Sequence, residues 1–284
     1  MNVMNPESPL FFEVYERPLS FRGKSGEYYD SPNHKAIVRM KDGEPIQIGM
    51  VGKNYKVIKM RELCESVEDE LRNGLNPTVF QGVQVHDRTA YHGGICIRQY
   101  VFPSTKISVG NHSRVAFRTV IVNGYDGASS FKMYSGAIDF FCENGMVSGS
   151  YDMIVARHSA GLTIPKVASI LNRSIEVFHT QANTWRKWVW KKITTDDARE
   201  CFKSMPNVSD RRVEQLVHLY KIETERHGNT IWAMYSAATF FASHDKGDFA
   251  VRDTGRDHLA STLLQREKDV QLWQESESFL KLAA

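Results

Sequence analysis

The chain has 284 residues, of which 42% are hydrophobic and 11% aromatic, and its 36 Lys and Arg face 33 Asp and Glu. This composition excludes a disordered or fibrous protein, and the length suits one large or two small globular domains. No apolar run approaches the about 18 residues of a membrane helix, and residues 1–16 carry acids and prolines in place of a signal peptide. We therefore expect a soluble protein of the cytoplasm, with no membrane partner.

The net charge of +3 is unevenly distributed along the chain. Residues 1–150 hold 17 basic and 16 acidic side chains, residues 151–193 hold seven and two, and residues 194–284 hold 12 and 15. The middle segment therefore carries a net charge of +5 between a nearly neutral front and an acidic tail. This distribution predicts that a polyanion would contact the middle segment, and an ordinary solvated helix face is the alternative.

The first 30 residues mix proline, glutamate and aromatic residues without a period, so we interpret residues 1–34 as an irregular N-terminal arm. Four apolar residues of this arm are expected to dock on the domain or on a neighbouring subunit: Leu10, Phe11, Phe12 and Tyr15.

Residues 35–164 predict an antiparallel sheet with a packed helix, which we interpret as a nucleic-acid-binding core. A hairpin is expected over 36–51 and an amphipathic helix over about 56–73. Further strands are expected over 79–86, 90–102, 115–122, 129–141 and 146–156. The connections between them are expected at 87–89, 123–127 and 143–145, the second of which has Asn-Gly and Asp-Gly pairs.

From residue 165 to the end the hydrophobic period becomes helical, which predicts an all-helical half. One long helix carries an apolar stripe of Leu171, Ile175, Phe178, Ala182, Trp185 and Val189. Thr194 and Ser209 are expected to cap two further helices, which end near Pro206 and Gly228. A buried helix over 231–244 and a last helix over 258–279 complete the prediction.

The four cysteines predict buried, reduced thiols, because they are more than 30 residues apart and form no metal-binding pattern: Cys64, Cys96, Cys142 and Cys201.

No motif for nucleotide binding, nucleophilic hydrolysis or zinc binding occurs, so we expect no enzyme, cofactor or metal. An enzyme with an unfamiliar site would require residues such as Asp126, Asp139, His158 or His244 to converge in a cleft. The His244-Asp245 pair is also compatible with a helix cap.

Three tryptophans alternate with four cations over residues 185–192, in the sequence WRKWVWKK. On a helical wheel Trp185 belongs to the apolar stripe and Trp188 lies at its edge. Arg186, Lys187 and Trp190 fall in a sector away from the core, where an indole ring stacks on bases and cations bind phosphates. Packing of Trp190 under the helical half or at a subunit contact is the alternative.

A second set of candidate DNA-binding residues lies on or beside the predicted strands: Lys53, Tyr55, Lys56, Arg98, Arg118, Lys132 and Arg157. Arg118 and Lys132 flank the 123–127 turn at equal distances, which predicts that hairpin pairing brings them together around an anion. A partly buried ion pair of Arg118 with Asp139 or Glu143 is the competing interpretation.

Several blocks of this sequence resemble one family. They read VGKNYKVI at 51–58, YDGASS at 125–130, FCENGMV at 141–147, ARHSAG at 156–161 and NTIWAMYSAAT at 229–239. In this order they are similar to the phage/plasmid-like proteins of the domain-of-unknown-function family nine-hundred-thirty-two, over about 50–245. The resemblance implies a mobile-element origin and no established activity.

A more distant similarity is to phage single-strand annealing recombinases of the Redβ/Erf type. It implies a curved antiparallel sheet packed on a helix. Together with the all-helical C-terminal half predicted above, this gives an expected α+β fold. It also implies a ring or helical homo-oligomer that holds single-stranded DNA and anneals complementary strands without ATP, in recombination or replication. The alternative function is a phage protein-binding module that sequesters a host or defence factor, with residues 10–15 and the tryptophans as anchors.

Overall fold

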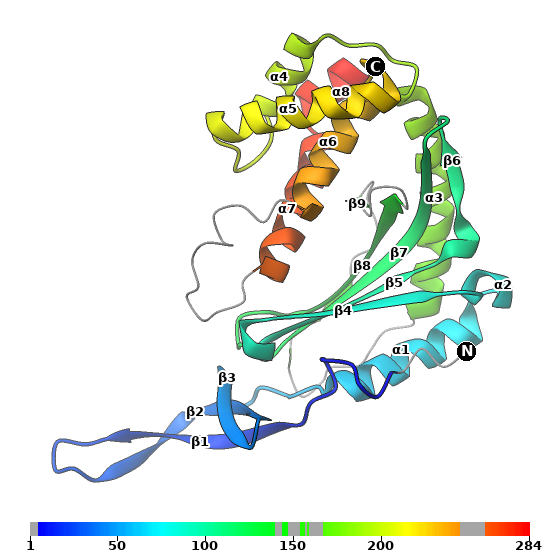
Figure 1. Cartoon of the computed structure of the whole chain (residues 1–284). Coiled ribbons are helices and arrows are strands. Elements are labelled where there is room, and N and C mark those ends of the chain that lie inside the picture. Colours follow the sequence, from blue (N-terminus) through cyan, green and yellow to red (C-terminus); the bar gives the residue numbers. More distant parts are fainter. Residues whose placement is uncertain (1–4, 140–143, 147–153, 157, 159–166, 245–258) are drawn as a thin grey trace.

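The computed structural model describes residues 5–139, 144–146, 154–156, 158, 167–244 and 259–284. It has the predicted α+β architecture, with antiparallel sheets in the N-terminal half and helices in the C-terminal half (Figure 1). Among the described residues, no helix has the length and apolarity required to cross a bilayer.

A three-stranded antiparallel sheet forms first, from β1 (Val14–Arg22), β2 (Tyr28–Lys41) and β3 (Glu44–Gly52). The predicted hairpin over 36–51 is confirmed, and its turn places Asp42 and Gly43 at positive φ. The prediction of an irregular arm is wrong, because β1 pairs with β2 and both project from the body of the molecule (Figure 1). Most side chains of β1 are exposed on both faces, so the strand lacks the alternation that reveals strands in a sequence.

The residues before β1 dock on the domain, as predicted. Leu10 is completely buried, and the rings of Phe11 and Phe12 pack against the core. Arg98 lies over Phe11 and Arg39 over Phe12, at 4.7 and 4.5 Å from the ring centroids. Tyr15, expected to dock with them, is 39% exposed.

A larger antiparallel sheet follows, in the order β10-β8-β7-β5-β4, with β6 paired to β7 and β9 to β8. Its long strands are β4 (Gln84–Ala90), β5 (Ile95–Val101), β7 (Ser113–Gly124) and β8 (Phe131–Asp139). The short strands are β6 (Ile107–Val109), β9 (Asn144–Met146) and β10 (Ile154–Ala156). The sheet is visibly curved (Figure 1).

Three predicted boundaries in this sheet are wrong. The chain over Pro77–Phe80 forms the short helix α2, because Asn76 caps it through the amide of Thr78 and Pro77 suits a first helical turn. Residues 87–89, expected to be a connection, lie inside β4, and the chain reverses at η1 (Tyr91–Gly93), where three successive residues have positive φ. Asn144 and Gly145, also expected in a turn, pair with β8 as part of β9.

Helices α1 (Met60–Gly74) and α3 (Val167–Trp188) cover one face of the large sheet (Figure 1). The predicted stripe of α1 is confirmed, with Leu63, Val67 and Leu71 completely buried. Phe178 of α3 packs edge-on against Phe117 of β7, at 6.0 Å between ring centroids. The two sheets meet where Gly49 of β3 lies against Tyr125, so closely that a Cβ atom there would collide with the Tyr125 carbonyl oxygen.

The C-terminal half consists of α4 (Thr195–Lys203), α5 (Asp210–His227), α6 (Ile231–His244), α7 (Leu259–Gln274) and α8 (Glu277–Ala283). The predicted Thr194 cap is confirmed as a reciprocal capping box with Asp197, and α6 is buried as predicted. The last helix is divided in two, because Ser276 accepts a hydrogen bond from the amide of Phe279 and starts α8. Phe279 then packs on Trp188 and Trp273, with ring centroids at 5.1 and 4.8 Å.

Candidate functional site

The side chain of Arg98 points to the helix-covered face of the sheet and is completely buried. Its Nε and Nη2 donate to Asp87 at 2.9 and 2.8 Å, and its Nη1 donates to Glu68 of α1 at 3.2 Å. Burial raises the pKa of Glu68, while the guanidinium opposes that rise. Arg98 therefore joins β4, β5 and α1 in an internal ion-pair network and presents no free charge to DNA.

Arg118 is also buried, at 2% exposure, and lies on the opposite face of the sheet. The competing prediction named the wrong partner: an ion pair forms, but its Nη2 lies 2.6 Å from Glu267 of α7 and not against Asp139. Glu143 lies outside the described residues. Its Nη1 donates to Gln99 at 2.7 Å.

The predicted pairing of Arg118 with Lys132 is wrong. Arg118 faces Gly136 and Lys132 faces Val122, because β7 continues through Gly124 and the hairpin turns later than the sequence suggested. Asp126 holds that turn by accepting hydrogen bonds from the amides of Ala128 and Ser129, at 3.0 and 2.7 Å.

Three of the predicted cations lie exposed around one end of the large sheet, and we call them the sheet-end cluster: Lys53, Lys56 and Lys132. Tyr55 connects this segment to β7, because its hydroxyl donates to the carbonyl of Gly124. His158 stacks on Tyr55 with ring centroids 4.7 Å apart, and its backbone carbonyl accepts from the amide of Lys56. Arg157 lies outside the described residues.

The predicted orientation of the three tryptophans at the end of α3 is confirmed. Trp185 is completely buried, Trp188 is 5% exposed, and Trp190, just beyond the helix, is 79% exposed. Four exposed cations surround it, and we call these five residues the tryptophan patch: Arg186, Lys187, Trp190, Lys191 and Lys192.

The position of the patch is fixed by the strands beside it. Arg186 donates from Nε to the carbonyl of Ser108 at 3.3 Å and from Nη1 to Asn183 at 2.9 Å. Val189 fits against Gly110 of the β6–β7 turn, where a side chain would be too close. Lys192 forms an isolated bridge with Thr230 at the start of α6.

The tryptophan patch and the sheet-end cluster do not form one surface. The patch lies beside the beginning of β7, and the cluster lies near its end at Gly124 (Figure 1). The 12 residues of β7 lie between them, which at ~3.3 Å per residue is roughly 40 Å along the strand. The strand-borne and helix-borne candidates are therefore two separate basic surfaces.

Among the candidate catalytic residues, the two aspartates do not come together. Asp126 precedes β8 and Asp139 ends it, so they lie at opposite ends of that strand. His158 is buried, which lowers its pKa, and its Nδ1 faces the carbonyl of Lys56. No cluster of three potential metal ligands occurs in the described part of the chain. The described thiols, Cys64, Cys96 and Cys201, are free and buried as predicted, and Cys142 lies outside the described residues.

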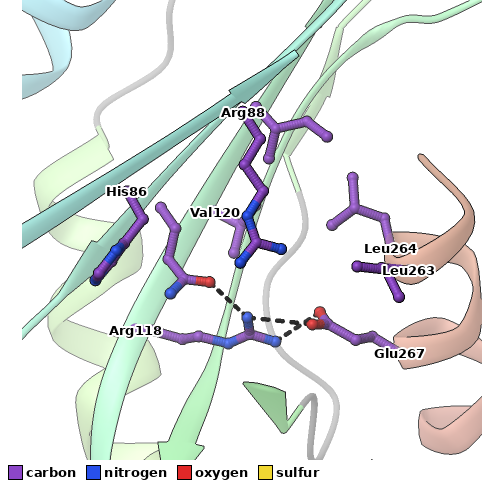
Figure 2. A pocket seen from close by; sticks show the side chains of 9 residues that line it. His86, Arg88, Arg118, Val120, Leu263, Leu264 and Glu267 are labelled. Atoms are coloured by element: carbon purple, nitrogen blue, oxygen red, sulfur yellow. Dashed lines mark hydrogen bonds and ion pairs between the residues drawn. The ribbon is translucent and has the colours of Figure 1, made fainter. Parts of the chain in front are cut away.

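A small hollow, with a cavity volume of about 30 Å³, lies between the large sheet and α7 (Figure 2). Its polar lining comes from β4, β5, β7 and α7: His86, Arg88, Gln99, Arg118 and Glu267. Its aliphatic lining consists of Ile97, Val120, Leu263 and Leu264. Of these nine residues sequence reasoning selected only Arg118, because the alternation of His86 and Arg88 on one face of β4 becomes visible only when 87–89 is recognised as strand.

Comparison with known proteins agrees with the resemblance of the sequence blocks. No significant match to this chain was found among curated proteins or among solved structures. The model of one family, described as "Domain of unknown function (DUF932)", matches residues 47–269, which include both basic surfaces and the hollow. The chain therefore belongs to the DUF932 family.

Proposed function

We propose that this protein binds single-stranded DNA through the tryptophan patch, and that it anneals complementary strands without ATP as a cytoplasmic homo-oligomer. One observation carries the proposal. Trp190 is 79% exposed, whereas the other four tryptophans of the chain are at most 5% exposed. Tryptophan is enriched at binding interfaces, where its large ring supplies most of the contact energy.

The chemistry of the tryptophan patch fits an unpaired strand better than a duplex. The face of an exposed indole stacks on any base that is free of its partner, whereas the bases of a duplex are already stacked. The four cations around Trp190 neutralise phosphates, and no acidic residue lies between Arg186 and Lys192. The contact of Arg186 with Ser108 holds one of these cations in place before DNA binds.

Annealing requires a second contact for DNA, and the sheet-end cluster supplies exposed cations for it. Lys53, Lys56 and Lys132 carry no aromatic neighbour that is as exposed as Trp190, so they would bind backbone phosphates and leave bases accessible. Arg98 and Arg118 would not contact DNA, because their guanidinium groups are buried against carboxylates.

The experiment measures fluorescence anisotropy of a labelled oligonucleotide, single-stranded or duplex, over a series of salt concentrations. We expect a clear preference for the single strand and an affinity that falls with salt by roughly 0.7 logarithmic units per neutralised phosphate for each logarithmic unit of salt. Equal affinity for both forms would refute the proposal. Mass photometry with and without the oligonucleotide tests the oligomer, and renaturation of two complementary strands tests annealing.

A second candidate function is a protein-binding module, and the β1–β2 hairpin favours it. Phe21 and Tyr28 are 57% and 74% exposed on this projecting element, and Phe21 stacks on Tyr29 at 6.1 Å between ring centroids. The predicted anchors at 10–12 pack in or against the protein's own core, so a partner would contact the hairpin instead. A Phe21→Ser, Tyr28→Ser double variant should then lose a stoichiometric host partner while charge reversal at Lys132 leaves that partner bound.

A further inference from the structure

Two directions lead away from the exposed ring of Trp190, and they differ in charge. Toward the helical half, the chain continues into α4, whose first turn carries the exposed carboxylates of Asp196 and Asp197. Toward the large sheet, the neighbouring element is the hairpin of β6 and β7. Residues 88–125, which include this hairpin, contain five Lys and Arg and no Asp or Glu. Because carboxylates repel phosphates and cations attract them, the charges favour a bound strand that leaves Trp190 toward the sheet.

The β6–β7 hairpin packs against the tryptophan patch at two points. The Nε of Arg186 donates to the carbonyl of Ser108 in β6, at 3.3 Å. The side chain of Val189 lies on Gly110 in the hairpin turn, where an added Cβ atom would be only 3.1 Å from Val189 Cγ1. β6 runs beside α3 in Figure 1. Trp190 directly follows Val189, so the exposed ring and the hairpin are neighbours on one surface.

Alternation along both strands places one arginine on the solvent side of this hairpin. Val109 of β6 and Val115 of β7 are completely buried, so their neighbours Ser108 and Arg114 point to the other side and are exposed. Ser108 and Arg114 face each other across the hairpin, which brings their Cβ atoms within about 5.5 Å. Arg114 therefore lies next to the backbone group that Arg186 binds. Within the described part of the chain, no side-chain hydrogen bond or ion pair engages the guanidinium of Arg114.

We propose that a single strand bound at Trp190 continues over the outer face of the β6–β7 hairpin, where Arg114 binds the phosphate next to the one held by Arg186. This inference rests on the proposed DNA-binding function and adds to it a further binding residue and the path of the strand. A guanidinium group presents parallel N–H donors that match two phosphate oxygens. Arg186 uses its Nε and Nη1 for Ser108 and Asn183, which leaves Nη2 for a phosphate, whereas Arg114 offers its whole guanidinium group.

Fluorescence anisotropy of a labelled single-stranded oligonucleotide, over a series of salt concentrations, tests the path with three variants. Arg114→Gln removes one phosphate contact, so it should reduce the salt slope by about 0.7 and weaken binding at low salt roughly fivefold to tenfold. Arg211→Gln removes the same charge from an exposed position on α5 and serves as the control, with an unchanged slope expected. Asp196→Asn removes a carboxylate from the direction that the strand avoids, so it should leave the affinity unchanged.

Oligonucleotides of increasing length locate the lost contact. The affinity of the unmodified protein should rise with length as the strand extends from Trp190 to Arg114. Arg114→Gln should bind the shortest oligonucleotides, which cover only Trp190, as tightly as the unmodified protein does, and should bind the longer ones more weakly. An equal loss of affinity at every length would show that Arg114 acts on the tryptophan patch itself, and would overturn the proposed path.

The proposed function and the proposed path fail in different ways. An unmodified protein that does not bind the single strand would refute both. If Trp190→Ala weakened binding while Arg114→Gln matched the Arg211→Gln control, the DNA-binding function would stand and the path over the hairpin would be wrong. Tighter binding by Asp196→Asn would place the strand over α4 and would likewise overturn the path.

Discussion

Replacing Trp190 with alanine removes the exposed ring of the tryptophan patch and leaves its four cations in place. The ring is 79% exposed in the free protein, so its loss opens no cavity, and we expect a change in stability within about 0.5 kcal/mol. Stacking of one base on an aromatic side chain contributes ~1–3 kcal/mol, which corresponds to a loss of single-strand affinity between roughly fivefold and 150-fold.

Intrinsic fluorescence and anisotropy measure this effect together. Trp185, Trp232 and Trp273 are completely buried, so emission from a water-exposed indole comes from Trp190. A single-stranded oligonucleotide should quench that component in the unmodified protein, and Trp190→Phe should lose the component while it retains part of the affinity. Phe21→Ala removes another exposed ring, on β1, and is the matched control.

The salt dependence separates stacking from charge. Trp190→Ala should lower the affinity at every salt concentration without changing the slope, whereas Lys187→Gln should reduce the slope by about 0.7. An oligonucleotide affinity of Trp190→Ala within twofold of the Phe21→Ala control would refute the reasoning.

Three further predictions concern the fold. Leu10→Ala should lower the free energy of unfolding by ~2–5 kcal/mol in urea, because Leu10 is completely buried, while Phe21→Ala should change it little. Arg98→Leu should cost ~3–5 kcal/mol, since it leaves the carboxylates of Asp87 and Glu68 buried without their cation; a cost equal to that of the exposed Lys132→Leu would contradict the network. Burial and the neighbouring Arg226 and His112 lower the pKa of His227 from 6.5 to about 4. The unfolded chain therefore binds the proton first, and stability should fall as pH decreases from 6.5 to about 4. His227→Gln should reduce the dependence of the free energy of unfolding on pH by at most about 1.4 kcal/mol per pH unit. Urea unfolding at several pH values measures this dependence. The same dependence in the variant as in the unmodified protein would show that His227 is not the titrating group.

Capping residues and hydrophobic periodicity, which are local sequence patterns, were sufficient to predict the helices of the C-terminal half. The capping residue Thr194 and the apolar stripe of α3 predicted where helices begin and which rings are buried, and the same periodicity placed Trp190 outside the core. These features depend on residues three or four positions apart, where a single helix determines the geometry.

The sheet and its pocket depend on contacts that no local pattern encodes. The register of β7 and β8 follows from the position of the Asp126 turn, and a shift in that turn separates Arg118 from Lys132. The partner of Arg118 is Glu267, 149 positions away in the sequence. The β1–β2 hairpin escaped detection because it has no buried face along most of its length, and strand alternation is visible only where one face is buried.

The residues on either side of the family match complete the folded unit. The match begins at residue 47, inside β3, and ends at residue 269, inside α7. A chain trimmed to these limits would lose β2, which supplies every hydrogen-bonded neighbour of β3, together with the buried Leu10. It would also lose Trp273 and Phe279, two completely buried rings that close the helical half. The segment that the family model matches is therefore shorter than the unit that packs together in this structure, and biochemical work on this protein should use the longer boundaries.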